Sequence, residues 1–251
     1  MLKRFTEDGW SLDARVGRAV LDGEFTRGQI VCAKTLYRYV DLGLFGIRNH
    51  NLPEKLKRKS TKHRSRINKK KLGRSTPERP REIESREKFG HWECDLVLGA
   101  KTRDKQALLT LAERKSREFP MLPIANKTSG CVMEAIKQLQ ETYSEHFSDV
   151  FKTITTDNGS EFADLSELEK MADTLVYYAH SYTSCDKETV ERHNGLIRRF
   201  IPKGKRIDNF TGQQISDVET WCNCLPRKVL GYKTPDEIFE EEIDRIYQAT
   251  A

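Results

Sequence analysis

Long apolar runs are missing from this sequence of 251 residues, in which 37% of the residues are hydrophobic and 33% are charged. No segment approaches the roughly 18 consecutive apolar residues of a membrane-spanning helix. The first ten residues, MLKRFTEDGW, have no apolar stretch after their charges and do not resemble a secretory signal peptide. These absences argue against a membrane protein and predict a cytoplasmic location.

Closely spaced cysteine pairs are also lacking. The six cysteines are scattered singly apart from one Cys-x-Cys pair: Cys32, Cys94, Cys131, Cys185, Cys222 and Cys224. This spacing differs from the paired motifs of structural zinc sites. We expect reduced thiols, several of them buried as small apolar side chains.

The sequence also lacks the pattern of a hydrolase catalytic triad. His91, His180 and His193 have no serine or cysteine partner in a recognisable nucleophile motif.

Charge is unevenly divided along the chain, although the net charge is only +6. Residues 1–88 carry 23 Lys and Arg against 11 Asp and Glu, whereas residues 89–251 carry 21 against 27. A basic front half joined to an acidic rear half is typical of a polyanion-binding arm attached to a domain that concentrates carboxylates.

Residues 9–40 have the pattern of two short helices around a glycine-containing connection. Ser11 is suited to cap the first helix, and Leu12, Val16 and Val20 recur at helical spacing. This spacing predicts one apolar face on the first helix.

The second helix is predicted over residues 33–40, with Leu36 and Val40 inward. Four of its other side chains are available to a DNA groove: Lys34, Thr35, Tyr37 and Arg38. The two helices outline a helix-turn-helix. A small helical hairpin with a solvated basic face fits the pattern equally well.

The segment from Lys55 to Arg74 contains eleven Lys and Arg and no acid. Such a block cannot pack into a core, so it predicts a solvated linker. Against a duplex each basic residue can replace a condensed counterion, which gives salt-dependent affinity without sequence preference. We favour phosphate contact over a solubilising tether, because the block joins a possible groove reader to the acidic half.

From residue 89 onward the pattern is that of an α/β layered sheet. Strands are predicted at residues 91–98, 106–112, 119–125, 152–156 and 174–179, and helices at residues 129–147, 165–171 and around Glu191. Pro120 and Pro123 cannot donate to a strand ladder, which predicts an edge position for the third strand. Ligands of such sheets gather at strand ends.

Asp95 lies beside Leu96, Val97 and Leu98 in a strand that is predicted to be largely buried. An ionised carboxylate there costs several kcal/mol unless it is paired or coordinates a cation. Its partner is therefore a metal ion or an arginine. Glu93, two positions earlier on the same strand face, is a second acid or a decoy.

Two further acids follow. Asp157 ends the run TITTD, where Asp-Asn-Gly is also an ordinary turn signal. Glu191 lies near a helix start, where the macrodipole favours an acid without any chemistry. That helix has an apolar stripe of Val190, Ile197 and Ile201 and a polar stripe of Glu191, Asn194 and Arg198.

Three acids from two strands and a helix suffice to anchor a pair of Mg²⁺ ions. Hard divalent ions prefer oxygen ligands, and two of them about 4 Å apart activate an attacking oxygen and stabilise a leaving one. The sequence therefore predicts a metal site at Asp95, Asp157 and Glu191.

The segments around these acids resemble those of a known family, the insertion-sequence transposases of the IS30 type, members of the retroviral-integrase superfamily. FGHWECDLVLG, TTDNGSEFA and TVERHNGLIRRFIPKG are similar to the segments that carry the two catalytic Asp residues and the catalytic Glu of that family. Thirty-three residues separate Asp157 from Glu191, as in the family, and PRKVLGYKTPDEIF resembles its carboxy-terminal signature. The resemblance runs from Gly9 to about Phe239.

The resemblance implies a metal-dependent enzyme that cleaves and joins DNA at the inverted repeats of its own element and works as a homo-oligomer. Asp95, Asp157 and Glu191 would bind two Mg²⁺ ions, with Mn²⁺ as a possible substitute. Water would be the first nucleophile and the freed 3′-hydroxyl the second. Candidates for contacts to DNA near the metals are Asn194, Arg198, Arg199 and Lys203; a solvated helix end is the alternative for the last three.

The implied fold is of the α/β class: an RNase H-like mixed sheet with flanking helices, preceded by a small helix-turn-helix-like region. We expect four segments: a DNA-binding region at residues 1–45, a basic linker at 46–88, an RNase H-like catalytic core at 89–201 and a helical extension at 202–251.

The sequence also departs from the family pattern. It begins at what resembles the second helical part of the usual amino-terminal region. Cys94 and Glu188 stand where the family commonly has Gly, Val190 stands where Asn is usual, and Leu225 replaces a common Arg. A Gly lost at position 188 predicts the loss of a turn with positive φ that aims Glu191.

Two rival functions stay open. A shortened, catalytically inactive transposase would act only as a DNA-binding protein. A host-adapted nuclease of the same fold would cut DNA that lacks inverted repeats.

Overall fold

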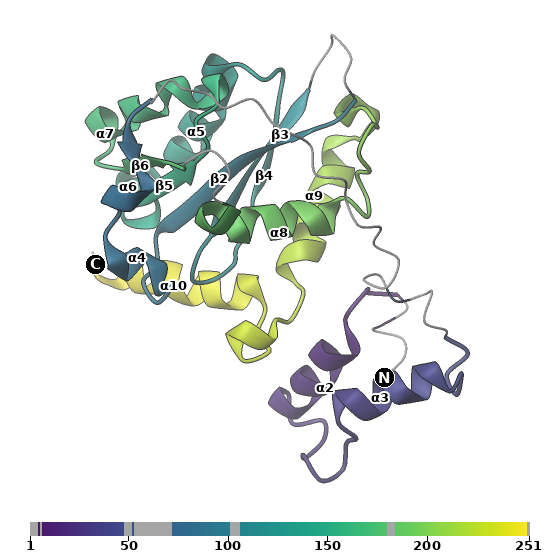
Figure 1. Cartoon of the computed structure of the whole chain (residues 1–251). Coiled ribbons are helices and arrows are strands. Elements are labelled where there is room, and N and C mark those ends of the chain that lie inside the picture. The colour runs from purple at the N-terminus through teal and green to yellow at the C-terminus, as the bar shows by residue number, and fades with distance from the viewer. Residues whose placement is uncertain are drawn as a thin grey trace. The chain divides into compact units, whose positions relative to one another are not determined.

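The computed structural model of the chain describes residues 5, 7–47, 52, 72–100, 106–179 and 184–249, and only the backbone of Ser184 and Cys185. The chain forms two compact units (Figure 1). Unit 1 comprises Met1–Arg66 and Leu225–Thr234, and unit 2 comprises Ile67–Cys224 and Pro235–Ala251. Within the described ranges, no helix has the length and apolar character needed to cross a bilayer. The functional division into four segments stays a prediction.

Unit 1 is built on helices α2 (Leu12–Leu21) and α3 (Ala33–Asp41). Ser11 caps α2 as predicted, because its Oγ accepts a hydrogen bond of 3.0 Å from the backbone N–H of Ala14. Leu12 packs with Leu36 and Val40 of α3 in a small core. Both helices predicted from the sequence are therefore confirmed.

The inward face of α2 differs from the prediction at its carboxy-terminal end. Val20 is only half-buried, whereas Ala19 and Arg15 are buried. Arg15 donates a hydrogen bond of 2.5 Å to Glu24. Neighbouring residues of an α-helix point about 100° apart, so the buried face of α2 can include Ala19 while Val20 next to it stays half-buried.

The segment Leu225–Thr234 folds as part of unit 1 and includes a short 3₁₀ turn, η7 (Lys228–Leu230). Gly17 of α2 lies against the ring of Tyr232, where an added Cβ would clash with the ring. Lys228 lies 4.0 Å from Asp13. This segment of the carboxy-terminal signature therefore packs on α2.

Unit 2 contains a mixed sheet of six strands in the order β1-β6-β5-β2-β3-β4 (Figure 1). Their bounds are β1 Arg74–Ser75, β2 His91–Leu98, β3 Ala107–Glu113, β4 Met121–Ile124, β5 Thr153–Thr156 and β6 Leu175–Tyr178. β3 is antiparallel to β2 and β4, whereas β5 is parallel to β2 and β6. The predicted mixed α/β sheet is confirmed, β4 lies at an edge as Pro120 and Pro123 predict, and β1 was not predicted.

Seven helices of unit 2 are described, together with short 3₁₀ turns. The helices are α4 Arg81–Glu84, α5 Ser129–Tyr143, α6 Phe147–Val150, α7 Leu168–Met171, α8 Glu188–Ile197, α9 Gly212–Asn223 and α10 Pro235–Ala249. The turns are η2 Thr76–Glu78, η3 Ser144–His146, η4 Ser160–Glu167, η5 Ser184–Lys187 and η6 Ile207–Asn209. The single helix predicted over 129–147 breaks at Ser144, whose φ of 46° is incompatible with a right-handed helix.

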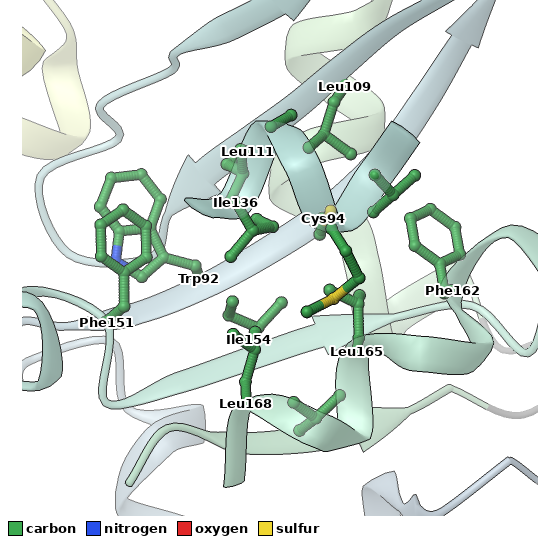
Figure 2. Packing of buried hydrophobic residues seen from close by; sticks show 14 of the residues in the cluster. Trp92, Cys94, Leu109, Leu111, Ile136, Phe151, Ile154, Phe162, Leu165 and Leu168 are labelled. Carbon is green, nitrogen blue, oxygen red and sulfur yellow. The ribbon is translucent and has the colours of Figure 1, made fainter. Parts of the chain in front are cut away.

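The two faces of the sheet carry separate apolar cores. One core joins Trp92 and Cys94 of β2 to α5, η4 and α7 through residues such as Ile136 and Leu165 (Figure 2). The other joins Val97 of β2 to α8 and α9. Because side chains alternate along a strand, Glu93 and Asp95 share the face of Val97, toward α8. The acids of β2 are thus placed beside the helix that carries Glu191.

Candidate active site

Asp95 and Asp157 meet because β2 and β5 are neighbouring parallel strands. Glu93 lies opposite Thr155 in this pairing, and extending the register by two residues brings Asp95 opposite Asp157. The Asp95 side chain is 24% exposed and that of Asp157 is 48% exposed. Both predicted acids therefore lie at the same end of the sheet and within reach of solvent.

Asp157 is also held by the turn that its sequence predicts. Its Oδ1 accepts a hydrogen bond of 3.2 Å from the backbone N–H of Gly159. A Cβ at Gly159 would lie 3.0 Å from that same oxygen, so the close turn favours glycine there. The turn uses only Oδ1 of Asp157, so Oδ2 of the same carboxylate is available to a second partner.

That second partner is Lys187, a residue that the sequence analysis did not single out. Its Nζ lies 3.1 Å from Asp95 Oδ1 and 3.6 Å from Asp157 Oδ2. Burial alone would lower the pKa of Lys187, but the charges of Asp95 and Asp157 outweigh it and raise the pKa above its ordinary value. The ammonium is therefore a charged group shared by two acids.

Helix α8 supplies the remaining polar groups. Asn194 donates a hydrogen bond of 2.9 Å from Nδ2 to Asp95 Oδ2, so the polar stripe predicted for this helix faces the acids. Partial removal from water raises the pKa of Glu191; Lys187 lowers it, and the negative charges of Asp95, Glu93 and Asp157 raise it further. Glu191 thus lies in the electrostatic field of the two aspartates.

The donor set fits a cation in part. Asp95 and Asp157 already contact one positive group, and their oxygens are the ligand type that Mg²⁺ prefers. Over the described ranges, however, no group of three or more His, Cys, Asp and Glu is arranged to hold a metal ion. Two of the three predicted ligands therefore share a cation position, and the role of Glu191 as a metal ligand stays a prediction.

Glu93 was expected to be either a second acid of the metal site or an acid with no part in it, and its contacts fit the latter. Its side chain is 0% exposed and lies 3.4 Å from Nη1 of Arg114, itself buried. Glu93 Oε2 accepts a hydrogen bond of 2.9 Å from the backbone N–H of Val190, in the first turn of α8. An acid at this helix end satisfies a free N–H and interacts favourably with the helix dipole. Glu93 thus anchors the start of the helix that carries Glu191.

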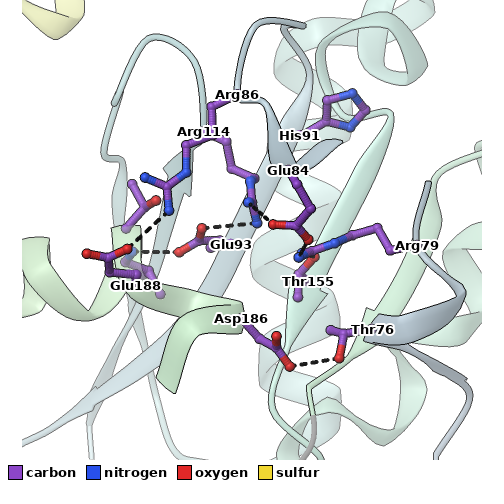
Figure 3. A network of polar contacts seen from close by, with 12 residues as sticks. Thr76, Arg79, Glu84, Arg86, His91, Glu93, Arg114, Thr155, Asp186 and Glu188 are labelled. Carbon is purple, nitrogen blue, oxygen red and sulfur yellow. Dashed lines mark hydrogen bonds and ion pairs between the residues drawn. The ribbon is translucent and has the colours of Figure 1, made fainter. Parts of the chain in front are cut away.

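A polar network extends from Glu93 across the chain segment that precedes β2 (Figure 3). Arg114 also pairs with Glu84 at 3.1 Å, and Glu84 is bridged in turn to the buried Arg79. Arg79 donates a hydrogen bond of 3.0 Å to Thr155 Oγ1 on β5. The network therefore connects both acid-bearing strands to one set of arginines.

Two further contacts tie the approach to α8 to the same segment. Thr76 donates a hydrogen bond of 2.7 Å to Asp186, and Arg86 lies 3.3 Å from Glu188 (Figure 3). Lys187 lies between these two anchored residues. The two contacts join segments that lie more than 100 residues apart in the sequence.

Position 188 has no turn with positive φ, in line with the expectation for a lost Gly, and the effect on the direction of Glu191 stays a prediction. Glu188 is the first residue of α8 and is not among the residues with positive φ. The helix begins there without the turn for which glycine would be needed, and Glu93 accepts a hydrogen bond from its first turn. Two of the other departures, Cys94 and Val190, are buried in the two cores.

His91 and His193 have structural environments. His91 Nδ1 lies 2.9 Å from Thr153 Oγ1, and His193 stacks on Phe119. Burial, with the nearby charges of Lys152 and Arg114, lowers the pKa of His91 to about 4. The five cysteines with described side chains form no disulfide among the described residues, and His180 lies outside those residues.

The candidate DNA contacts after Glu191 have different surroundings. Arg198 donates hydrogen bonds to the backbone carbonyls of Leu98 and Ile201, at 2.9 and 3.4 Å. Arg199 is exposed and lies over the ring of Trp221, and Lys203 is exposed. Arg198 therefore fixes the end of α8, whereas Arg199 and Lys203 face solvent.

The candidate groove residues of α3 also divide. Lys34 and Arg38 are exposed, Thr35 lies 3.3 Å from the Cys32 sulfur, and Tyr37 packs partly against the small core. Residues 55–71 of the basic block lie outside the described residues.

Comparison with known proteins finds several transposases. The chain is 39% identical over 209 residues to a probable transposase for insertion-like sequence element IS1161 of Streptococcus salivarius, covering 82% of this chain and 58% of that protein. It is 31% identical over 250 residues to the transposase for insertion sequence element IS4351 of Bacteroides fragilis, covering 96% of this chain and 72% of that protein. Against transposase InsI for insertion sequence element IS30C of Escherichia coli it is 35% identical, covering 66% of this chain and 42% of that protein.

The chain thus spans little more than half the length of the Streptococcus relative. No family model matches the sequence. Among solved structures, the catalytic core domain of BIV integrase aligns with a TM-score of 0.47 at 19% identity, covering 64% of this chain and 99% of that one.

Proposed function

Because the chain belongs to the IS30 family of insertion-sequence transposases, we propose that it cleaves and joins DNA at the ends of an insertion sequence. The observation that carries this proposal is the meeting of Asp95 and Asp157 around one cation position. Adjacent strands that bring two acids together at a solvent-accessible sheet end suit phosphoryl transfer by bound divalent ions.

Under this proposal, Asp95, Asp157 and Glu191 hold two Mg²⁺ ions, for which Mn²⁺ can substitute. When bound, such ions activate the attacking oxygen and stabilise the leaving oxygen. The protein's own part is to hold these acids. Asn194 orients Asp95 through its amide, and Glu93 fixes the first turn of α8 and so the direction of Glu191.

The proposed DNA contacts come from two elements that are argued separately. Lys34, Thr35, Tyr37 and Arg38 of α3 would read or contact a groove of the inverted repeat, with the exposed Lys34 and Arg38 contributing most. Near the acids, the exposed Arg199 and Lys203 would contact DNA phosphates. Asn194 and Arg198 are further candidates for contacts to DNA on the same helix end. Each phosphate neutralised makes binding more salt-dependent. Assembly into at least a dimer on DNA belongs to the same proposal.

The test is Mg²⁺- or Mn²⁺-dependent nicking of a labelled duplex that carries the ends of the element. Glu191→Gln keeps the size of the side chain and removes its charge, and should lower the nicking rate by about a hundredfold or more, as when one preorganised charge-stabilising group is lost. Glu188→Gln is the matched control, because Glu188 lies three residues earlier on α8 and pairs with Arg86. It should cut at the parent rate.

Three outcomes would contradict the proposal. Equal cutting by the parent and Glu191→Gln would remove Glu191 from the site. Binding of both without cutting would identify a DNA-binding protein without catalysis. Cutting of duplexes with and without inverted repeats at equal rates would identify a nuclease of this fold.

A further inference from the structure

Lys187 occupies a position that its sequence context does not explain. It is the last residue of η5 and directly precedes α8, yet its side chain is only 8% exposed. Lysine is rarely buried to this extent unless it is paired. Its two partners are Asp95 and Asp157, the acids that the proposed function assigns to metal binding.

The balance of charge around these acids depends on Lys187. Arg114 pairs with Glu93 and balances its charge, so Glu93 does not need Lys187 as a partner. Asp95 and Asp157 both contact the Lys187 ammonium, and Glu191 is also within its field. Two like charges brought together in a partly buried site repel unless a cation lies between them. Lys187 supplies that cation from within the chain.

A divalent ion and the ammonium cannot both keep these contacts. A metal ion bound to Asp95 and Asp157 takes the oxygens that Lys187 now contacts, and the two positive charges repel. The lysine side chain has a flexible four-carbon stem, and the Asp157 side of the site is about half exposed. The ammonium can therefore move toward solvent when its partners are taken.

On the basis of the proposed function, we propose that Lys187 is a built-in counter-ion that fills the cation position between Asp95 and Asp157 until a divalent ion displaces it. The lysine stabilises the metal-free protein and weakens its affinity for the ion, because the ion pairs must break before the metal binds. Lys187 thus sets the metal concentration at which the site fills.

The test is a calorimetric titration of the full chain with Mn²⁺. Lys187→Met keeps the length of the side chain without its charge and should bind Mn²⁺ about tenfold more tightly, the factor that corresponds to about 1.4 kcal/mol. Lys187→Gln is a second uncharged variant in case the first does not fold, and Lys187→Arg, which keeps the charge, should retain the weak affinity. The matched control is Lys115→Met, since Lys115 pairs with Glu242 of α10 at 2.9 Å instead. It should bind as the parent does.

The failures are distinguishable when Asp95→Asn is titrated beside them. If Asp95→Asn abolishes binding while Lys187→Met binds no more tightly than the parent, the counter-ion proposal is overturned and the metal site stands. If neither the parent nor Lys187→Met binds Mn²⁺, the proposed function loses its metal and the counter-ion proposal falls with it. A melting temperature that is lower for Lys187→Met without metal, and that rises more steeply with Mn²⁺, would support the proposal.

Discussion

Glu93 and Asp95 lie two residues apart on the same face of β2, yet the protein holds them in opposite ways. Glu93 has no exposed surface, and its partners are a buried arginine and a backbone N–H of α8. Asp95 is about a quarter exposed, and its partners are a lysine and an amide side chain. The first acid is enclosed by rigid groups, whereas the second is contacted by groups that can rearrange.

The difference teaches how one strand separates stability from chemistry. An arginine pairs with a carboxylate through a planar, permanently charged group, which suits a fixed contact. A lysine is a single charge on a flexible stem and gives up its position more easily. The acid that anchors the helix therefore has the arginine, and the acid that we propose to bind metal has the lysine.

The largest expected effect comes from breaking the enclosed pair. Glu93→Gln leaves Arg114 buried without its charged partner on β2, and such a loss typically costs about 3 kcal/mol or more. Asp95→Asn is the matched change on the same strand and should cost less than Glu93→Gln, because Asp95 is about a quarter exposed and Lys187 keeps Asp157 as a charged partner. Urea denaturation of both variants measures the difference, and equal losses would contradict the comparison.

A second effect concerns the first residue of β2, at the enclosed end. His91 has a pKa of about 4 in the folded protein, below its ordinary value of 6.5, so the unfolded chain binds the proton more readily. The stability that the neutral ring contributes is present above about pH 6.5 and is lost as the pH falls toward 4, by up to about 3 kcal/mol. His91→Asn keeps a polar group near Thr153 and removes this titration. The unfolding free energies of the parent and His91→Asn should converge as the pH falls from 7 to 4. Parallel curves would exclude His91 as the cause of the loss of stability in acid.

The smallest effect is expected at the exposed edge of the network. Arg86 and Glu188 form an ion pair in which the Glu188 side chain is more than half exposed. Pairs of this kind contribute about 0–1 kcal/mol, so Glu188→Gln should change the unfolding free energy by less than about 1 kcal/mol. A loss as large as that of Glu93→Gln would show that the start of α8 depends on Arg86 as well as on Glu93.

Much of unit 2 could be predicted because its strands have local signals. The run HWECDLVL ends in three consecutive apolar residues and gave the bounds of β2, and Pro123, with Pro120 just before the strand, placed β4 at an edge. Ser11 and the spacing of Leu36 and Val40 gave both helices of unit 1. Strand β1 has only two residues and no periodicity, so it depends on pairing with β6.

Of the candidate site, the sequence predicted the acids and the polar stripe of α8 that carries Asn194. Asp95 and Asp157 end up together because β2 and β5 are adjacent, and adjacency is a property of the sheet. The sequence did not indicate roles for Lys187, Arg79 and Arg114, because charged residues are common in this chain and the burial of these three arises from tertiary contacts. One signal was present: Glu93 in a buried strand requires a cation, and Arg114 directly follows the strand that pairs with β2.

The assignment of Leu225–Thr234 to unit 1 has a topological consequence. The chain leaves unit 2 after Cys224 and returns to it at Pro235, so unit 1 is joined to unit 2 by three covalent crossings instead of one. A single cut between Arg66 and Ile67 would leave the Tyr232 segment attached to unit 2 and its packing partner, Gly17, on the released piece. In the intact chain the tether keeps these two surfaces at a high effective concentration, and dilution cannot separate them.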